Sequence, residues 1–77
     1  MNNTRRKQLR KAIELMETVS SIIEEMRDEE QECFDNMPEG IQVSERGEQI
    51  ETNAYDLDEA YESLAEIIDN INDIIDR

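Results

Sequence analysis

The chain of 77 residues contains no histidine and no tryptophan. Without histidine it lacks the commonest general base and the imidazole ligands of di-iron helical bundles. Its single cysteine, Cys33, excludes an internal disulfide and a cysteine-based zinc site, and lies in an apolar row that favours a packing role. We therefore expect a protein that is not an enzyme, with no catalytic residues, no metal and no cofactor.

Aromatic residues, glycine and proline are also scarce: three aromatic side chains, two glycines and one proline. This composition predicts long helices rather than a sheet. No apolar run approaches the roughly 20 residues that span a membrane. The first residues lack an apolar signal region, so we expect a cytoplasmic protein. The length predicts one domain, residues 1–77, near the lower size limit for a self-supporting core.

Acidic side chains are abundant, and their distribution is uneven. The chain has 21 acidic and 8 basic residues, for a net charge of −13. Residues 1–11 carry five bases and no acid, so the rest of the chain carries all 21 acids and three bases, an excess of −18. Such a surface repels nucleic acid and attracts basic proteins in a salt-dependent way. An acidic surface also keeps a small helical protein soluble, and both interpretations stay open.

Apolar residues recur at alternating spacings of three and four in both halves of the chain, which is the pattern of packed helices. We expect helices at about 4–34 and 44–76, with Thr4 and Ser44 as N-caps, separated by the breakers Pro38 and Gly40. The first row is Ala12, Met16, Val19, Ile23, Met26, Glu30, Cys33 and Met37. The second row is Ile50, Ala54, Leu57, Tyr61, Leu64, Ile68, Ile71 and Ile75.

The two rows match if the chain turns near residue 40, so that facing residues have numbers that add up to about 80. The expected pairs are Met26 with Ala54, Ile23 with Leu57, Val19 with Tyr61, Met16 with Leu64, Ala12 with Ile68 and Leu9 with Ile71. Cys33 then faces Gly47, and Ile41 and Val43 fold back over the end of the core. The fold class predicted is all-α, an antiparallel helical hairpin.

Charge favours the same arrangement. Bases at a helix N-terminus and acids at a C-terminus both oppose the helix dipole. In an antiparallel hairpin the bases of residues 5–11 lie beside Asp69, Asp73 and Asp76, and we expect the two clusters to neutralise each other. The basic stretch could also be read as a nucleic-acid patch, but it lacks interleaved aromatic residues, and we prefer the intramolecular interpretation.

Flanking apolar rows widen both faces beyond what one partner helix covers. We expect self-association, in the simplest case a dimer that forms a four-helix bundle. The alternative is a hairpin that docks onto a different protein. The self-association residues predicted are Leu15, Ile22, Ala60, Ile67 and Ile74.

Two acidic patterns resemble metal sites, but neither is expected to bind a metal ion. The pairs Glu45/Glu48 and Glu66/Asp69 match the spacing of all-α nucleotide pyrophosphohydrolases, yet they lie about 27 Å apart on one predicted helix. The segment 69–73 starts like a calcium loop, but Ile74 takes the position of its glycine.

Glu30 interrupts the first apolar row. One interpretation is that it reaches solvent near the loop end of the hairpin. The other is that it pairs with Arg27 or Arg46 and fixes register or oligomeric state.

The run from Asp28 to Gln42, followed by Ser44 to Glu48, resembles a group of short, uncharacterised helical proteins encoded by phages and integrated mobile elements of Gram-positive bacteria. This resemblance covers about a quarter of the chain. It implies a phage or mobile-element product that works in a bacterial cytoplasm, and it carries over no functional residues.

We therefore expect a non-enzymatic interaction protein whose acidic helical surface binds a basic host protein, as an inhibitor or nucleic-acid mimic. Its partners would be a second copy and a basic, nucleic-acid-binding protein, but neither nucleic acid itself nor a membrane. The alternative is a structural, assembly or small-molecule-sequestering bundle that acts through its apolar faces. The partner-binding residues predicted are Glu14, Glu17, Glu24, Glu25, Asp28, Asp58, Glu59, Glu62, Glu66 and Asp69.

Overall fold

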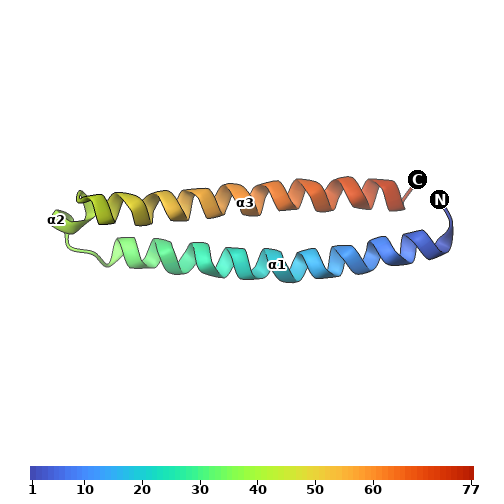
Figure 1. The fold of residues 1–77 in the computed structure, drawn as a ribbon, viewed down its shortest axis with the longest axis horizontal. Coiled ribbons are helices and arrows are strands. Elements are labelled where there is room, and N and C mark those ends of the chain that lie inside the picture. The colour runs from blue at the N-terminus through green and yellow to red at the C-terminus, as the bar shows by residue number, and fades with distance from the viewer.

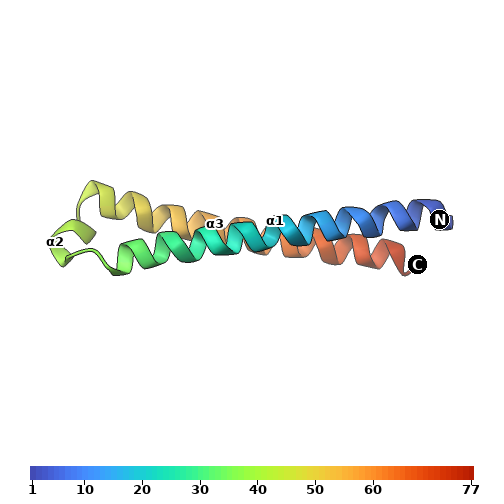
Figure 2. The same ribbon diagram turned by 90° about the horizontal axis from the view of Figure 1, so that it is seen from below.

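The computed structural model describes residues 1–77 as three helices and no strand: α1 (Asn3–Asp35), α2 (Glu39–Gln42) and α3 (Glu45–Ile75). The molecule is elongated, 58 × 15 × 13 Å. The long helices α1 and α3 lie side by side and run in opposite directions, with both chain termini at one end and α2 at the other (Figures 1 and 2). The prediction of an all-α chain is confirmed.

The N-terminal caps of the two long helices differ in how well the sequence predicted them. Ser44 caps α3 as expected, accepting a hydrogen bond from the Gly47 amide at 3.4 Å. The prediction of Thr4 for α1 is wrong, because the Asn2 side chain accepts from the Arg5 amide at 2.8 Å. Asparagine is at least as good an N-cap as threonine, so the helix starts before Thr4.

The connection at the α2 end contains a helical turn that the pattern did not predict. The Phe34 carbonyl oxygen near the end of α1 accepts two hydrogen bonds, from the Met37 amide at 3.1 Å and from the Gln42 side chain at 2.9 Å, so Gln42 ties the connection to α1. Gly47 is buried, and a Cβ atom there would collide with the backbone carbonyl oxygens of Ile41 and Gln42. Glycine at this position therefore lets α2 lie directly on the first turn of α3.

Two expectations for this end are wrong. Gly47 faces the backbone of α2, and Cys33 is exposed. Ile41 and Val43 do not cover the core, since they are 45% and 76% exposed. It is the backbone of Ile41 and Gln42, not the side chains of Ile41 and Val43, that packs against Gly47.

The row of α3 that packs on α1 is the one predicted. Every member from Ile50 to Ile75 is half-buried or buried, and Ala54 and Ile75 are the most buried at 3% and 6%. Apolar residues occupy it from Ile50 to Ile75, whereas the neighbouring row through Ala60, Ile67 and Ile74 is interrupted by Asn53 toward α2.

The row of α1 that packs on α3 is shifted from the prediction by one residue at every second position. Val19, Met26 and Cys33 are exposed. Their neighbours take the inward positions, and the observed row is Leu9, Ile13, Met16, Ser20, Ile23, Arg27, Glu30, Phe34 and Met37. Both rows obey the same spacing, so apolar content alone selected the wrong one.

The register between the helices is also different. Arg27 bonds Asp58, Glu30 bonds Asn53, and Glu24 lies against Tyr61, so contacting residues have numbers that add up to 85, 83 and 85. The expected total of about 80 is wrong by roughly one helical turn, because α2 lengthens the connection. In particular, Val19 does not pack on Tyr61: it is 47% exposed, and Tyr61 lies beside Arg27 and Glu24.

Candidate interaction surfaces

The helix pair has a thin core. Its buried apolar residues are Ile13, Ala54 and Ile75, and no large side chain is fully buried. Several large aliphatic side chains are about half exposed instead: Leu15 (62%), Ile22 (54%), Val19 (47%), Ile67 (47%) and Met26 (39%). A row of large apolar side chains is thus exposed to solvent.

One side of the helix pair is marked by a groove of about 400 Å³ near the α2 end. In each helix the lining residues are spaced three or four apart, so they form a stripe along one side. The stripe of α1 and the stripe of α3 meet at this groove. Its lining residues are Met26, Glu29 and Glu30 from α1, and Asn53, Asp56 and Leu57 from α3.

The opposite side is marked by a second groove at the same level of the helices. Its volume is about 330 Å³. It is lined by Arg27, Asp28 and Gln31 from α1, and by Glu51, Ala54, Tyr55 and Asp58 from α3. The two linings share no residue, so they identify which positions of each helix belong to which side.

In a pair of helices whose inward residues alternate at spacings of three and four, two residues that are seven positions apart lie on the same side of the pair. From the first groove, such steps lead along α1 through Val19, Ile22 and Leu15, and along α3 from Asn53 through Ala60 to Ile67 and Ile74. We call this surface the apolar face: Leu15, Val19, Ile22, Met26, Ala60, Ile67 and Ile74.

All five of the predicted self-association residues lie on this face. Leu15, Ile22, Ala60 and Ile67 are exposed, and Ile74 is half-buried. Val19 and Met26 belong with them but were assigned to the core. Ala12, Val19, Met26 and Cys33 follow one another at intervals of seven residues. This regular spacing was the signal in the sequence that they form a separate row from the inward residues of α1.

The predicted partner-binding residues lie away from the apolar face. Seven belong to the rows that pass through the second groove: Glu14, Glu17, Glu24, Asp28, Asp58, Glu62 and Asp69. The other three, Glu25, Glu59 and Glu66, lie on the outer backs of the helices. We call these ten residues the acidic face. The structure therefore separates the acidic and apolar surfaces onto different sides of one thin molecule.

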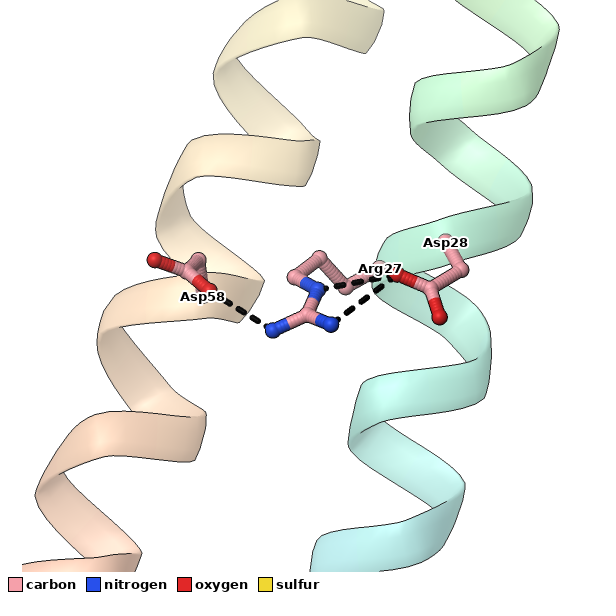
Figure 3. Close-up of polar contacts among 3 residues, drawn as sticks. All are labelled: Arg27, Asp28 and Asp58. Carbon is pink, nitrogen blue, oxygen red and sulfur yellow. Dashed lines mark hydrogen bonds and ion pairs between the residues drawn. The ribbon is translucent and has the colours of Figure 1, made fainter.

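Arg27 is the only basic residue that forms ion pairs in the molecule, and the sequence analysis did not predict that it joins the helices. Its guanidinium bonds the carboxylate of Asp28 at 3.0 Å and that of Asp58 on α3 at 2.7 Å (Figure 3). It also lies 5.3 Å from the ring centre of Tyr61. The hydrogen bonds to Asp28 and Asp58 raise the pKa of Arg27 above its ordinary value, against an opposing effect of desolvation. Arg27 thus joins α1 to α3 on the acidic side.

Glu30 follows neither of its two predicted roles fully. It is half-buried, and its partner is the amide of Asn53 at 3.3 Å rather than Arg27 or Arg46. The prediction of an arginine partner is wrong because Arg27 faces the other side, toward Asp58.

The basic segment meets the end of α3 in a way that differs from the prediction. No ion pair joins residues 5–11 to Asp69, Asp73 or Asp76. Arg6 instead donates to the backbone carbonyl oxygens of Ile75 at 3.1 Å and Arg77 at 3.4 Å. A cation at these free carbonyls stabilises the negative end of the α3 dipole, so the compensation involves backbone rather than carboxylates.

No group of three or more cysteine, aspartate or glutamate side chains is arranged to hold a metal ion. None of the helices is long and apolar enough to cross a membrane. No family model, no curated protein and no solved structure matches the chain.

Proposed function

We propose that this chain is a non-enzymatic interaction protein, an antiparallel helical hairpin with two working surfaces. The apolar face associates with a second copy to form a four-helix bundle. The acidic face then stays accessible and binds a basic protein. The observation that supports this proposal best is the separation of the two surfaces, because covering one leaves the other open.

The thin core supports the self-association. A helix pair of this size buries too little apolar surface to be strongly stable alone, and a second copy would cover the exposed aliphatic residues of the apolar face. A four-helix bundle is the simplest closed arrangement of two such pairs.

The acidic face supports a basic partner. Its carboxylates follow the long axis of a molecule 58 Å in length, and the only ion pairs in the chain engage two of them, Asp28 and Asp58. A row of negative charges of this kind imitates a nucleic-acid backbone for a protein that binds phosphates. In the phage or mobile-element context that the resemblance implies, the partner is a host nuclease or other nucleic-acid-binding protein in the bacterial cytoplasm, which this chain inhibits.

Two variants with the same net charge test the role of the acidic face. The first removes four of its carboxylates: Glu14→Gln, Glu17→Gln, Glu62→Gln and Asp69→Asn. The control removes four exposed carboxylates outside the rows of the second groove: Glu32→Gln, Glu39→Gln, Glu45→Gln and Asp73→Asn. Both keep the carboxylates bonded to Arg27 and lower the net charge from −13 to −9.

The measurement is capture of basic proteins from bacterial lysate on each immobilised variant at low and high salt, with DNA as competitor. We expect the first variant to lose the wild-type partner and the control to keep it, and we expect salt and DNA to release it. Equal loss by both variants would mean that net charge alone attracts proteins, and the proposal would fail.

A second candidate function is a structural or assembly role carried by the apolar face alone. The exposure of Leu15, Val19 and Ile22 favours it. Replacing Ile67 and Ile74 by glutamate separates the two functions. The structural role requires that partner binding and oligomerisation vanish together, whereas the acidic-face proposal requires that a basic partner still binds the dissociated chains.

A further inference from the structure

The apolar face ends in a cluster of acids near α2. Of the 21 acidic residues, the ones in or beside this face are Glu29, Glu30 and Asp56, and all three line the groove with Met26 and Leu57. None of them forms an ion pair, since both ion pairs of the molecule belong to Arg27 on the other side. Glu30 bonds the neutral amide of Asn53. The groove therefore gathers negative charge that no ion pair neutralises; the base on the same row, Arg46, lies seven residues beyond Asn53 and forms no ion pair with these acids.

The other end of the same face carries a base. Steps of seven residues from Met26 through Val19 and Ala12 lead to Arg5, which is exposed and forms no ion pair. The rest of the face between Arg5 and the acidic groove is uncharged. One surface thus has a positive end, an aliphatic middle and a negative end.

We propose that two copies associate through their apolar faces in an antiparallel orientation, with Arg5 of each copy over the acidic groove of the other. This inference rests on the self-association proposed above and adds its orientation, its register and the residues that set them. The charges select the orientation. With the α2 ends at opposite ends of the dimer, each base meets the unbalanced acids, whereas with the α2 ends together the two acidic grooves meet and repel each other.

The register follows from the apolar residues. Ile67 lies midway between Ala60 and Ile74 on α3, and it is level with the turn of α1 between Leu15 and Val19, because contacting residues have numbers that add up to 83–85. A two-fold axis through this level places Ile67 against the partner's Ile67 and Ala60 against the partner's Ile74. On α1 it places Leu15 against the partner's Val19.

The same axis brings the charges together without adjustment. The α1 position level with Ile67 is about residue 17, and Arg5 and Glu29 lie twelve residues to either side of it. The antiparallel register therefore sets Arg5 opposite the partner's Glu29. An aliphatic centre and a complementary polar rim are the usual anatomy of a self-complementary interface.

Cysteine cross-linking in a Cys33→Ser background tests the orientation. We expect Ile67→Cys to form a disulfide-linked dimer, because the two side chains meet at the axis. Glu66→Cys, one residue earlier on the outer back of α3, serves as the control and should not link. Neither Arg5→Cys nor Glu29→Cys should link alone, whereas the double variant should form covalent dimers. Within one chain the two positions are about 36 Å apart, so they cannot bridge internally.

Charge-exchange variants test whether Arg5 and Glu29 set the orientation of the dimer. We expect Arg5→Glu and Glu29→Arg each to raise the dissociation constant of the dimer about 3- to 10-fold in sedimentation at low salt, and the double exchange to restore it. With the α2 ends together, each α1 lies over the partner's α3, so a disulfide between Glu29→Cys on one chain and Asp56→Cys on another would overturn the antiparallel orientation but keep the proposed self-association. A monomer at all concentrations, with no cross-link in any variant, would overturn both.

Discussion

The two halves of the helix pair are held together by different kinds of contact. Near the chain termini, the packed rows consist of aliphatic side chains such as Ile13, Ile71 and Ile75. Toward α2 the same rows contain Arg27, Glu30 and the small residue Ala54, and α2 lies on Gly47. Aliphatic burial is non-directional and tolerates sliding, whereas hydrogen bonds and close backbone contact require one alignment.

This difference indicates a division of roles. We infer that the terminal half is held by aliphatic burial, and that the α2 half fixes the register in which the two helices pack. The four predictions that follow test the division, first in the terminal half and then in the features of the α2 half.

The largest effect is expected from Ile13→Ala in the terminal half. Ile13 is 8% exposed, and truncating it removes apolar contacts and leaves a cavity. We expect the free energy of unfolding to fall by about 2–4 kcal/mol, measured by urea titration followed by circular dichroism at one protein concentration. Val43→Ala, at a side chain 76% exposed, is the control and should change it by less than about 0.5 kcal/mol. Equal effects would show that the core is not where the structure places it.

The next effect is expected from Gly47→Ala. The added methyl group meets the carbonyl oxygens of Ile41 and Gln42, so α2 must move away from α3. We expect a loss of about 1–3 kcal/mol in the same titration. Gly40→Ala is the matched control, because nothing lies near a Cβ there, and it should be neutral or stabilising by up to about 1 kcal/mol. A stabilising Gly47→Ala would contradict the packing of α2.

Arg27→Met tests whether the α2 half sets register rather than stability. Replacing an ion-paired arginine with an apolar residue of similar length often preserves stability, so we expect the urea midpoint to stay the same or rise. We also expect the amide NMR signals of residues 50–61 to broaden as the helices sample neighbouring registers. Arg46→Met, at an exposed residue without an ion pair, should leave the spectrum sharp. A clear drop in stability with a sharp spectrum would assign the ion pairs a stabilising role instead.

The smallest effect concerns alkaline pH. The carboxylate of Glu24 beside its hydroxyl raises the pKa of Tyr61 above the ordinary value of 10.0, and burial adds to the shift. A raised pKa in the folded state means that the stabilisation is complete below pH 10 and is lost as the pH rises through the folded value. We expect Tyr61→Phe to lose less stability than wild type above pH 10.

Tyr55→Phe is the comparison for this experiment. The pKa of Tyr55 is also raised, but by Glu59 on the same helix. Its ionisation should therefore disturb α3 without separating α3 from α1. If the two variants behave alike in alkaline titration, the contact between Glu24 and Tyr61 does not join the helices.

The sequence predicted the long helices because breakers and caps are local features. Pro38 ends the first helix and Ser44 begins the last, whatever lies across from them. The α3 row was also predicted, since it is apolar from Ile50 to Ile75, whereas the neighbouring row through Ala60 and Ile67 contains Asn53. The α1 row was not, because Ser20 and Arg27 are poor candidates for an inward position until Asp58 and Tyr61 are known to lie opposite.

For the candidate surfaces, too, the sequence predicted one part and the tertiary structure decided another. The five self-association residues and the ten acids could be chosen from periodicity and charge. Their separation onto different sides depends on which α1 row packs inward, as does the place of Val19 and Met26 on the apolar face.

By itself, therefore, the sequence determined the helical content, the two long elements with their break, and the excess of negative charge, because each depends on residues close together in the chain. Only the tertiary structure decided the register, the inward row of α1 and the side on which each surface lies. These depend on α2 against Gly47 and on Arg27 against Asp58, contacts between residues that meet only after the chain has folded.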